Sequence, residues 1–368
     1  MKIGIIDADL IGKKQHNFPN LASMKLSGFH KKQGHEVELI HFDDISPNTL
    51  FVKHFDKVYI SKVFTDTKVP ENLLKLPFVE YGGTGFFYDK APNLPNEIEH
   101  CMPDYNLYDS WIKEKIRNGK KPSYFKYYTD YSIGFTSRGC FRQCDFCVNR
   151  NEKKVYPHSP LSEFLDLKRK KICLLDDNIL GCGGHWERII KELQATKKPF
   201  QYKQGMDIRI LSDKKAKLLS ECRYDGDYIF AFDNIQESEL IEKKIQLFKK
   251  HMPKTVPKLY VFCAFDRNNK YNNEFWINDI ISVFERMRML MKYKCLPYLM
   301  RFKKYSESPL KANYIDLAQW MNVPNTFKKK SINQISLTKW GKSWHKFKKQ
   351  HPEIAEKYFD LKFGEVSS

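Results

Sequence analysis

The segment TSRGCFRQCDFCVNR, residues 136 to 150, carries three cysteines within eight positions. Cys140, Cys144 and Cys147 follow the spacing C-x3-C-x2-C, and no fourth cysteine lies nearby. Clustered thiolates favour soft metal sites, which in proteins are zinc or an iron–sulfur cluster. A structural zinc ion takes four ligands, and His158 could be a distant fourth. A 4Fe–4S cluster normally takes four cysteines, so three would leave one iron with an open position. A chance grouping of cysteines in a core is the third alternative.

Six apolar stretches from Tyr131 onward predict β-strands that alternate with helices. They are YSIGFT, KICLLDD, FQYKQGMD, DYIFAFD, KLYVFCAF and CLPYLMRF, which begin at residues 131, 171, 200, 227, 258 and 295. Ser159 and Ser212 are the predicted N-caps of helices over residues 159–170 and 212–221. Six βα units predict a partial (β/α)6 barrel, related to the eight-stranded barrel, whose active site lies at the C-terminal ends of the strands. The cysteine segment directly follows the first strand, so it falls at that end.

The N-terminal part of the chain shows a separate alternation. KIGIID, EVELIH, KVYISKVF and LPFVEYGGTG are predicted strands, and LASMKLSGFHKKQG is a predicted helix. This pattern predicts an α/β domain with a doubly wound, Rossmann-like parallel sheet. The stretch that follows is rich in Pro, Asn, Tyr and Lys, which favours a linker. We therefore expect domains at residues 1–88 and 131–305, a linker at 89–130 and a basic helical extension at 306–368.

The composition fits a globular protein with a sizeable core. The 368 residues predict two domains, and a hydrophobic fraction of 42% with 27 Phe and 20 Tyr supplies core side chains. No apolar run approaches the roughly 18 residues that cross a membrane, and MKIGII is too short for a signal peptide. Nine scattered cysteines, an odd number, favour a reducing cytosol and metal or core roles over disulfides. We expect a cytoplasmic protein without membrane contact.

Positive charge is concentrated near the C-terminus. The formal net charge is +19, and no acidic residue lies between Asp316 and Glu353. Lysines in this window are interleaved with aromatic residues: Lys328, Lys329, Lys330, Lys339, Lys342, Lys346, Lys348 and Lys349 with Trp320, Phe327, Trp340, Trp344 and Phe347. Such a pattern favours phosphate contact with base stacking, and so a nucleic-acid partner. The alternative is a solvated lysine-rich face, because charge alone supports a partner class weakly.

The cysteine segment resembles the cluster loop of the radical S-adenosylmethionine (radical SAM) enzymes. Their signature is C-x3-C-x-aromatic-C after the first strand of a partial (β/α)6 barrel, and Cys140, Cys144, Phe146 and Cys147 match it. The adjoining TSRGC resembles the subgroup with a cobalamin-binding type of domain at the N-terminus. The resemblance implies that the three cysteines hold a 4Fe–4S cluster whose open iron binds the amino and carboxylate groups of S-adenosylmethionine.

The same resemblance implies a reaction and a partner. Reduction would cleave the sulfonium to methionine and a 5′-deoxyadenosyl radical, which takes a hydrogen atom from the substrate, while the protein orients the cofactors. An electron donor such as flavodoxin or ferredoxin is implied, and Phe146 would lie beside the adenine. The substrate is not identified by the sequence, and a nucleic acid and a peptide are both left open. The reaction type is also left open, because a fold does not choose it.

Polar residues at the ends of the next strands match further cofactor positions of the family. Asp176, Asp177 and Asn178 end the second predicted strand, where the family binds the methionine amino group, although its usual Gly-Gly-Glu is absent here. The alternative role for each of these residues, and for those of the following strands, is a helix cap or turn.

The third and fourth predicted strands end in QGMDIR and AFD. In family terms Gln204 and Asp207 would hold ribose hydroxyls, and Arg209 would pair with the methionine carboxylate through two parallel hydrogen bonds. Asp233 would face the substrate, which makes it the predicted catalytic residue.

The N-terminal segment DADLIGK, residues 7 to 13, resembles the D-x-H-x-x-G loop of cobalamin-binding domains, with Asp9 in place of the histidine. Ser61, Gly82 and Gly83 resemble further positions of that family. Carboxylate is a poor substitute for an imidazole ligand to cobalt. We therefore expect a domain that keeps the shape without requiring cobalamin, with aromatic side chains filling the space: Phe86, Phe87 and Tyr88.

The sequence thus predicts a radical SAM enzyme that modifies an unidentified substrate. Two alternatives remain open. One is a cobalamin-dependent radical SAM methyltransferase. The other, of a different class, is a zinc-stabilised nucleic-acid-binding protein without catalysis, in which the basic window is the main surface.

Overall fold

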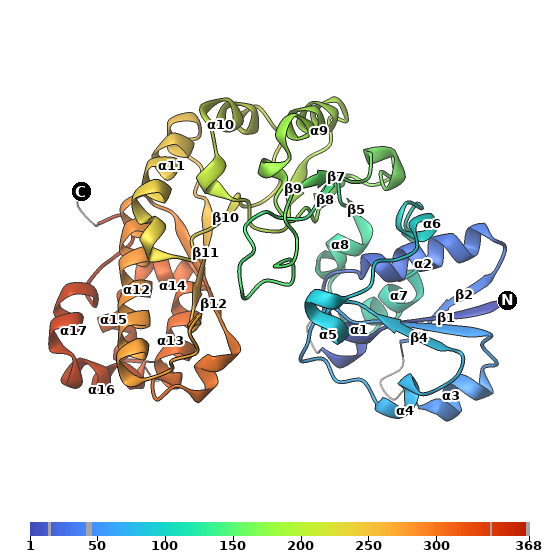
Figure 1. The fold of residues 1–368 in the computed structure, drawn as a ribbon, viewed down its shortest axis with the longest axis horizontal. Helices are drawn as coiled ribbons and strands as arrows, with labels where there is room; N and C mark the ends of the chain where they lie inside the picture. The colour runs from blue at the N-terminus through green and yellow to red at the C-terminus, as the bar shows by residue number, and fades with distance from the viewer. Residues whose placement is uncertain (14–15, 42–45, 339–340, 366–368) are drawn as a thin grey trace. The chain divides into compact units, whose positions relative to one another are not determined.

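The computed structural model describes residues 1–13, 16–41, 46–338 and 341–365 (Figure 1). Contacts divide the chain into two compact units. Unit 1 comprises Met1–Asp176 with Thr196–Phe200, and unit 2 comprises Asp177–Ala195 with Gln201–Ser368. The chain has the predicted α/β class with parallel sheets, whereas the predicted domain boundaries stay predictions.

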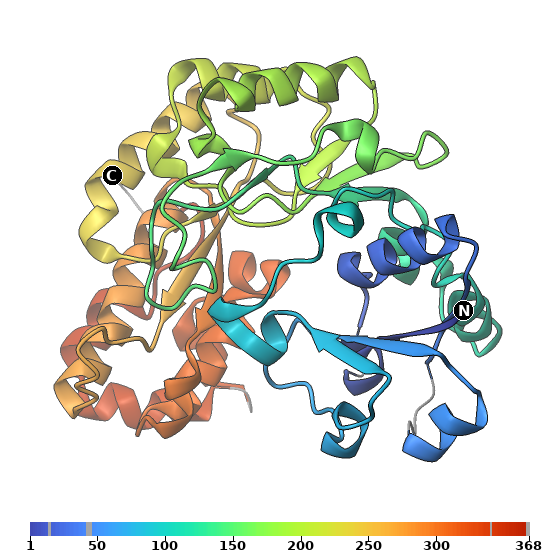
Figure 2. The same cartoon turned by 45° about the vertical axis from the view of Figure 1, so that its right-hand side comes forward.

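Unit 1 begins with a four-stranded parallel sheet of order β2-β1-β3-β4. Its strands are β1 (Lys2–Asp7), β2 (Glu36–Leu39), β3 (Lys57–Ser61) and β4 (Val79–Gly82). Its helices are α1 (Ala8–Gly12), α2 (Leu21–Lys32), α3 (Pro47–Val52), α4 (Glu71–Leu74) and α5 (Thr84–Phe87). Figure 2 shows α2 over one face of the sheet and α3 and α4 over the other.

The alternating direction of the apolar side chains along β1 explains why helices cover both faces of the sheet. Ile3 and Ile5 pack with Met24 of α2, whereas Ile6 packs with Val58 and residues of the opposite layer. Successive side chains of a strand point to opposite faces, so an apolar strand needs a helical layer on each side. The predicted doubly wound sheet is confirmed.

The predicted linker is packed structure within unit 1. It contains η1 (Tyr88–Lys90), α6 (Asn96–Glu99), α7 (Asp109–Arg117), η2 (Pro122–Phe125) and α8 (Lys126–Thr129). Tyr105, Trp111, Phe125 and Tyr128 are buried in the same core as β1 and α2. The amide of Ile133 donates to the Tyr105 hydroxyl at 2.8 Å, which fixes this segment to the strand before the cysteine loop.

All six strands predicted from Tyr131 onward form. β5 (Tyr131–Gly134), β8 (Lys171–Leu174) and β9 (Phe200–Tyr202) make a sheet of order β5-β8-β9. β10 (Ile229–Ala231), β11 (Lys258–Cys263) and β12 (Leu296–Arg301) make a parallel sheet of order β10-β11-β12. A parallel bridge between Met206 and Phe230 extends this second sheet. Strands that neighbour one another in sequence order suit a singly wound α/β barrel segment.

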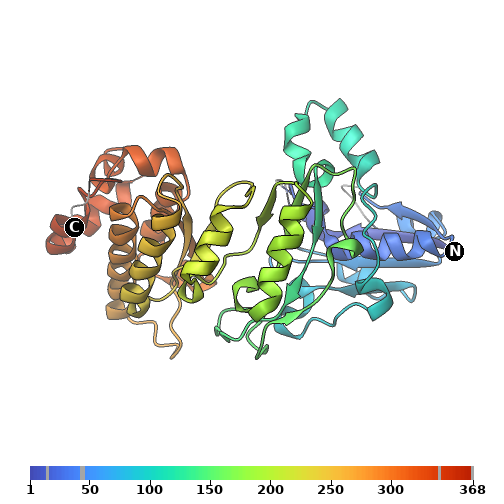
Figure 3. The same cartoon turned by 90° about the horizontal axis from the view of Figure 1, so that it is seen from above.

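The helices between these strands are mostly as predicted. Ser212 accepts the Lys215 amide at 3.3 Å and caps α10 (Asp213–Ser220), as predicted. The others are α9 (Gly183–Ala195), α11 (Ser238–His251) and α12 (Asn273–Lys292), with short turns η4 (Ile179–Gly181), η5 (Ile208–Ile210) and η6 (Ile235–Glu237). Figure 3 shows α11 and α12 side by side, where Glu242 accepts from the Tyr293 hydroxyl at 2.7 Å.

The prediction of a helix over residues 159–170 is wrong, because only η3 (Leu161–Glu163) forms there. Asp166 accepts the amide of Lys168 at 2.9 Å, and this side-chain turn competes with helical hydrogen bonding. The C-terminal part is helical: η7 (Lys303–Glu307), α13 (Lys311–Met321), α14 (Pro324–Lys329), α15 (Ile332–Ser336), α16 (Lys342–Gln350) and α17 (Pro352–Tyr358). Among the described residues, no helix is both long and apolar enough to span a bilayer.

Candidate functional site

The cysteine loop leaves the end of β5 through a short antiparallel ladder. β6 (Ser137–Arg138) pairs with β7 (Tyr156–Pro157) and closes the base of the loop. Gly139 has φ of +83°, and a Cβ there would lie 2.3 Å from the Lys154 carbonyl oxygen. The glycine of TSRGC is therefore required by the turn and by the close approach of the returning strand.

The three cysteines are half-buried on this loop, and none forms a disulfide. The Cys147 amide donates to the Cys144 carbonyl at 2.9 Å, which makes a turn between these two thiols. The amide of Asn149 is 3.4 Å from the Cys147 Sγ and donates to it. Hydrogen bonds to sulfur tune thiolate-held clusters, so the donor chemistry of this loop fits an iron–sulfur cluster.

Over residues 1–13, 16–41, 46–338 and 341–365, no three or more His, Cys, Asp or Glu side chains lie in a metal-binding arrangement. The metal role of Cys140, Cys144 and Cys147 therefore stays a prediction from their spacing. His158, the ligand that a zinc site would need, faces other groups. Its Nε2 is 3.4 Å from Glu99 Oε1 and its Nδ1 is 3.0 Å from Ser159 Oγ. Burial lowers the pKa of His158 to about 4, although Glu99 opposes this.

Asp176 at the end of β8 holds the entry to the cysteine loop. Its carboxylate is 3% exposed. It accepts the Thr136 amide at 3.2 Å and hydroxyl at 2.6 Å, and the Ser137 amide at 2.6 Å and hydroxyl at 2.7 Å. Burial raises its pKa, and the bonds from Thr136 and Ser137 oppose that rise. This local role accounts for the residue, and its predicted contact with the methionine amino group stays a prediction.

The exit of the loop is held by the segment after α5. The Tyr88 hydroxyl donates to the Phe146 carbonyl at 2.6 Å. Asp89 accepts the Arg150 Nε at 2.7 Å and the Asn151 Nδ2 at 3.0 Å. Phe146 itself is half-buried, and its predicted place beside an adenine stays a prediction. The sequence did not point to Tyr88 and Asp89 as neighbours of the loop, because the contact spans 58 positions.

The other predicted residues lie in unit 2. Asp177 is half-buried and Asn178 is buried directly before η4. Gln204 is exposed. Their predicted cofactor contacts stay predictions.

Asp207 and Arg209 are brought together, as members of one ion-pair network. Arg209 Nε donates to Asp207 Oδ1 at 2.6 Å, and Arg209 Nη1 donates to both Glu237 oxygens at 2.7 and 2.8 Å. Burial alone would lower the pKa of Arg209, but Asp207 and Glu237 outweigh it and raise that pKa. The guanidinium is thus committed to two internal carboxylates, and a third carboxylate would have to compete with them. Sequence reasoning missed Glu237, which has no motif to mark it.

Asp233 is half-buried after β10. Burial raises its pKa to about 6, while Arg286 and Arg209 oppose the rise. Arg286 of α12 is 1% exposed, and its Nη1 donates to the carbonyls of Phe232, Asp233 and Phe262 at 3.1, 3.0 and 2.9 Å. This arginine ties the ends of β10 and β11 together and was also missed, because an arginine in an amphipathic helix usually faces solvent.

Asp9, which lies in α1 directly after β1, is 1% exposed. It accepts the Val63 amide at 2.7 Å and the Thr67 hydroxyl, so it ties the loop after β3 to α1. Ser61 donates to Asn20 Oδ1 at 3.2 Å. The carboxylate that replaces the expected histidine therefore has a structural role at this edge of the sheet.

The glycine turn after β4 also packs on this edge. A Cβ at Gly83, which has φ of +104°, would lie 2.3 Å from the Lys62 carbonyl oxygen. The Lys62 ammonium lies 4.3 Å from the centre of the Phe86 ring. Phe87 is stacked on Tyr81 with ring centres 5.7 Å apart and remains 37% exposed. The aromatic residues expected to fill this space lie at the sheet edge, and the cobalamin prediction stays a prediction.

Four of the five aromatic residues of the basic window are buried, so these four rings are not exposed for the predicted base stacking. Trp320, Phe327, Trp344 and Phe347 are at most 2% exposed and form the core of the C-terminal helices. Lys339 and Trp340 lie outside the described residues. The remaining lysines of the window are exposed: Lys328, Lys329, Lys330, Lys342, Lys346, Lys348 and Lys349. The nucleic-acid prediction therefore depends on charge alone.

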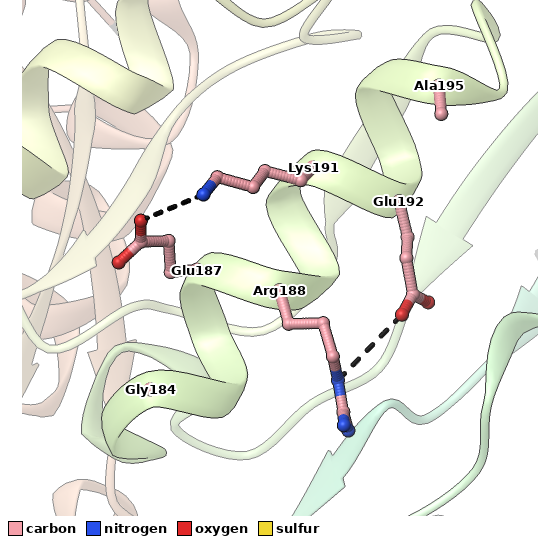
Figure 4. A pocket seen from close by; sticks show the side chains of 6 residues that line it. All are labelled: Gly184, Glu187, Arg188, Lys191, Glu192 and Ala195. Carbon is pink, nitrogen blue, oxygen red and sulfur yellow. Dashed lines mark ion pairs between the residues drawn. The ribbon is translucent and has the colours of Figure 1, made fainter.

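A hollow along α9 is lined by one helical face (Figure 4). Lys191 pairs with Glu187 at 3.2 Å, and Arg188 pairs with Glu192 at 3.8 Å. Both basic side chains are about two-thirds exposed, at 66% and 65%. Such i,i+4 pairs are ordinary features of a solvated helix, and no predicted site residue lines this hollow.

Comparison with known proteins gives limited likeness. No family model matches the chain. It is 26% identical over 146 residues to an uncharacterized methyltransferase of Synechocystis sp., which covers 36% of this chain and 27% of that relative. Among solved structures it is similar to the cobalamin-dependent S-adenosylmethionine radical enzyme OxsB with aqua-cobalamin and S-adenosylmethionine bound. The TM-score is 0.37 and the sequence identity is 12%, and the match covers 99% of this chain and 57% of OxsB. The form with aqua-cobalamin alone gives a TM-score of 0.36. The chain thus spans little more than half of OxsB, and overlap at this level establishes no shared function.

Proposed function

We propose that this protein is a radical SAM enzyme that cleaves S-adenosylmethionine reductively at a 4Fe–4S cluster held by Cys140, Cys144 and Cys147. The observation that carries the proposal is the C-x3-C-x-Phe-C spacing on a loop that directly follows the first strand of a parallel sheet. The amide directed at Cys147 Sγ supports it. A closed zinc site lacks its fourth ligand, because both nitrogens of His158 face oxygen atoms of other residues.

The cluster would supply the electron that cleaves the sulfonium and so generates a radical able to take hydrogen from substrate. The contribution of the chain is to hold and orient. Three thiolates from one loop would bind three irons and leave the fourth for the methionine moiety. Asp176 fixes the entry to that loop through Thr136 and Ser137, which lie between the end of β5 and Cys140.

Anaerobic reconstitution with iron and sulfide tests the proposal. We expect about four irons per chain, and 5′-deoxyadenosine after addition of S-adenosylmethionine and dithionite. Cys144→Ala should lose both. Cys101→Ala is the matched control, because Cys101 is another half-buried free thiol of unit 1, bonded to the Lys25 carbonyl at 3.2 Å. Normal 5′-deoxyadenosine formation by Cys144→Ala would contradict the assignment.

As the reaction type of this enzyme we propose methyl transfer. Its support is the sequence relative in Synechocystis sp., which is named as a methyltransferase. Whether cobalamin carries the methyl group is tested by the visible spectrum of protein desalted after incubation with cobalamin. Asp9, bonded to the loop after β3, supports our expectation that the lower cobalt ligand is not supplied at that position.

For the substrate class we propose a polyanion such as a nucleic acid, bound through the exposed lysines of α14 and α16. None of these lysines forms an ion pair with another described residue of the chain. Exposed lysines that form no ion pair gain most from phosphate contact, because binding releases counterions.

A further inference from the structure

The exit of the cysteine loop is tied to a segment that lies far away in sequence. We propose that Tyr88 and Asp89 are positioning residues that hold the Phe146–Asn151 part of the loop and so set the environment of the cluster. This inference rests on the proposed function. Tyr88 was expected only to fill space in the N-terminal domain, and neither residue was expected beside the cysteine loop.

The first tether is a hydrogen bond to the backbone between two cysteines. The Tyr88 hydroxyl donates to the Phe146 carbonyl at 2.6 Å, and Phe146 directly precedes Cys147. Tyr88 adopts φ of 50°, a conformation that is uncommon for a bulky residue. The backbone of Tyr88 is therefore held in an unfavourable conformation, which indicates that the surrounding structure fixes the position of this residue.

The second tether is ionic. Asp89 accepts from Arg150 Nε at 2.7 Å and from Asn151 Nδ2 at 3.0 Å, and its side chain is 8% exposed. Arg150 in turn donates through Nη1 to the Asp145 carbonyl at 3.3 Å, a residue that follows Cys144. One carboxylate thus orders a guanidinium that reaches back over the turn between Cys144 and Cys147.

The loop needs these tethers because it has little regular structure of its own. From Gly139 to Val155 the chain forms only turns and irregular segments. Asp176 fixes the entry through Thr136 and Ser137. Within the Phe146–Asn151 part the backbone forms short turns, such as the Arg150 amide to the Cys147 carbonyl at 3.3 Å, and Tyr88 and Asp89 add contacts from outside the loop. Ligand groups must be held to within about 0.5 Å for a defined site, which such turns do not secure.

Hydrogen exchange in the metal-free full chain tests the tethers without any cofactor. The probes are the amides of Cys147, Asn149 and Arg150, which the loop turns protect. Tyr88→Phe should accelerate their exchange about fivefold, the factor expected for one neutral hydrogen bond. Asp89→Ala should accelerate it about two- to fivefold, as for a partly exposed ion pair, and Asp89→Glu should restore most of the protection.

Matched controls exist in the same unit. The Tyr124 hydroxyl donates to the His16 carbonyl at 3.0 Å, so Tyr124→Phe removes an equivalent bond away from the loop. Asp66 pairs with Lys13 at 2.8 Å, so Asp66→Ala removes an ion pair of similar length, although a more exposed one. Neither control should change exchange at Cys147, Asn149 or Arg150. Accelerated exchange in Tyr88→Phe and Asp89→Ala but not in the controls supports the tethers, and exchange equal to that of the native chain overturns them.

The second measurement uses the reconstituted protein. We expect Tyr88→Phe and Asp89→Ala to shift the electron paramagnetic resonance signal and the midpoint potential of the cluster, with unchanged slow-exchanging core amides of unit 1. An unaltered signal and potential in both variants would overturn the positioning role. A native protein that binds no cluster would overturn the proposed function instead, while the exchange result would still decide whether the tethers exist. The two failures are therefore distinguishable.

Discussion

Replacement of Asp176 by alanine should loosen unit 1 at the entry to the cysteine loop. The carboxylate accepts four hydrogen bonds from Thr136 and Ser137, all in a buried setting. The two hydroxyls are able to rotate toward other acceptors, but the two amides are fixed by the backbone. Each buried N–H left without an acceptor costs about 1–3 kcal/mol. Loss of the acceptor for both amides should therefore destabilise unit 1 by about 2–6 kcal/mol in Asp176→Ala.

The assay is hydrogen exchange of the slowest amides of unit 1, which reports the free energy of its unfolding. Exchange at Thr136 and Ser137 reports the local effect. Asp213→Ala is the control, because Asp213 is an exposed carboxylate that pairs with Lys250 at 3.1 Å. A loss below about 1 kcal/mol with unchanged exchange at Thr136 and Ser137 would refute the account, since the amides would then have other acceptors.

The pH dependence gives an independent check on Asp176. Its pKa is raised because burial penalises the charged form, and the bonds from Thr136 and Ser137 compensate only in part. A carboxyl group with a raised folded-state pKa stabilises the fold fully below its unfolded-state pKa, near about 3.9. That contribution is lost as pH rises through the folded-state pKa. Asp176→Asn cannot titrate, so it should flatten this part of the stability profile.

Unit 2 contains two further groups whose replacement should have a measurable effect, Asp233 and the lysines at the end of α14. Burial raises the pKa of Asp233 to about 6, so its contribution to stability should be full below about pH 3.9 and lost as pH rises through 6. Asp233→Asn should remove this change from unfolding free energies measured across that range. Replacement of three exposed lysines, Lys328, Lys329 and Lys330, by glutamate should weaken retention on single-stranded nucleic acid and reduce the salt dependence of binding by up to about two units of slope. Retention equal to that of the native chain would leave these lysines as a solvated face.

The parts of the fold that local sequence determines were predictable. The apolar runs of the strands and the capping serine of α10 each depend on residues within a few positions. The helix expected over residues 159–170 failed for a related reason. Its serine and proline favour a helix start, but Asp166 bonds both the Lys168 amide and, through its own amide, the Ser132 hydroxyl. A partner 34 positions away outweighed the local preference.

The basic window shows where composition misled. Alternating lysines and aromatics suit base stacking and also suit a helix that buries one face. Along α16, Trp344 and Phe347 lie three positions apart and are both 1% exposed, while Lys346, Lys348 and Lys349 remain exposed. Helical spacing of three to four residues predicts exactly such a buried stripe. The spacing of the aromatics, rather than their presence among lysines, was the informative signal.

The candidate site was likewise predictable only in its local features. The spacing of its cysteines is visible in the sequence, but the groups that hold the loop are not. Asp176 reaches Thr136 across 40 positions, and Tyr88 reaches Phe146 across 58. A loop without strands or helices of its own has no periodic pattern to show how it is supported, so its partners become visible only when the chain is folded. If three thiols must be held at fixed positions, the site depends on residues outside the motif as well as on the cysteines. Variants at the entry and exit contacts are therefore the ones expected to weaken binding of the proposed cluster while every cysteine is kept.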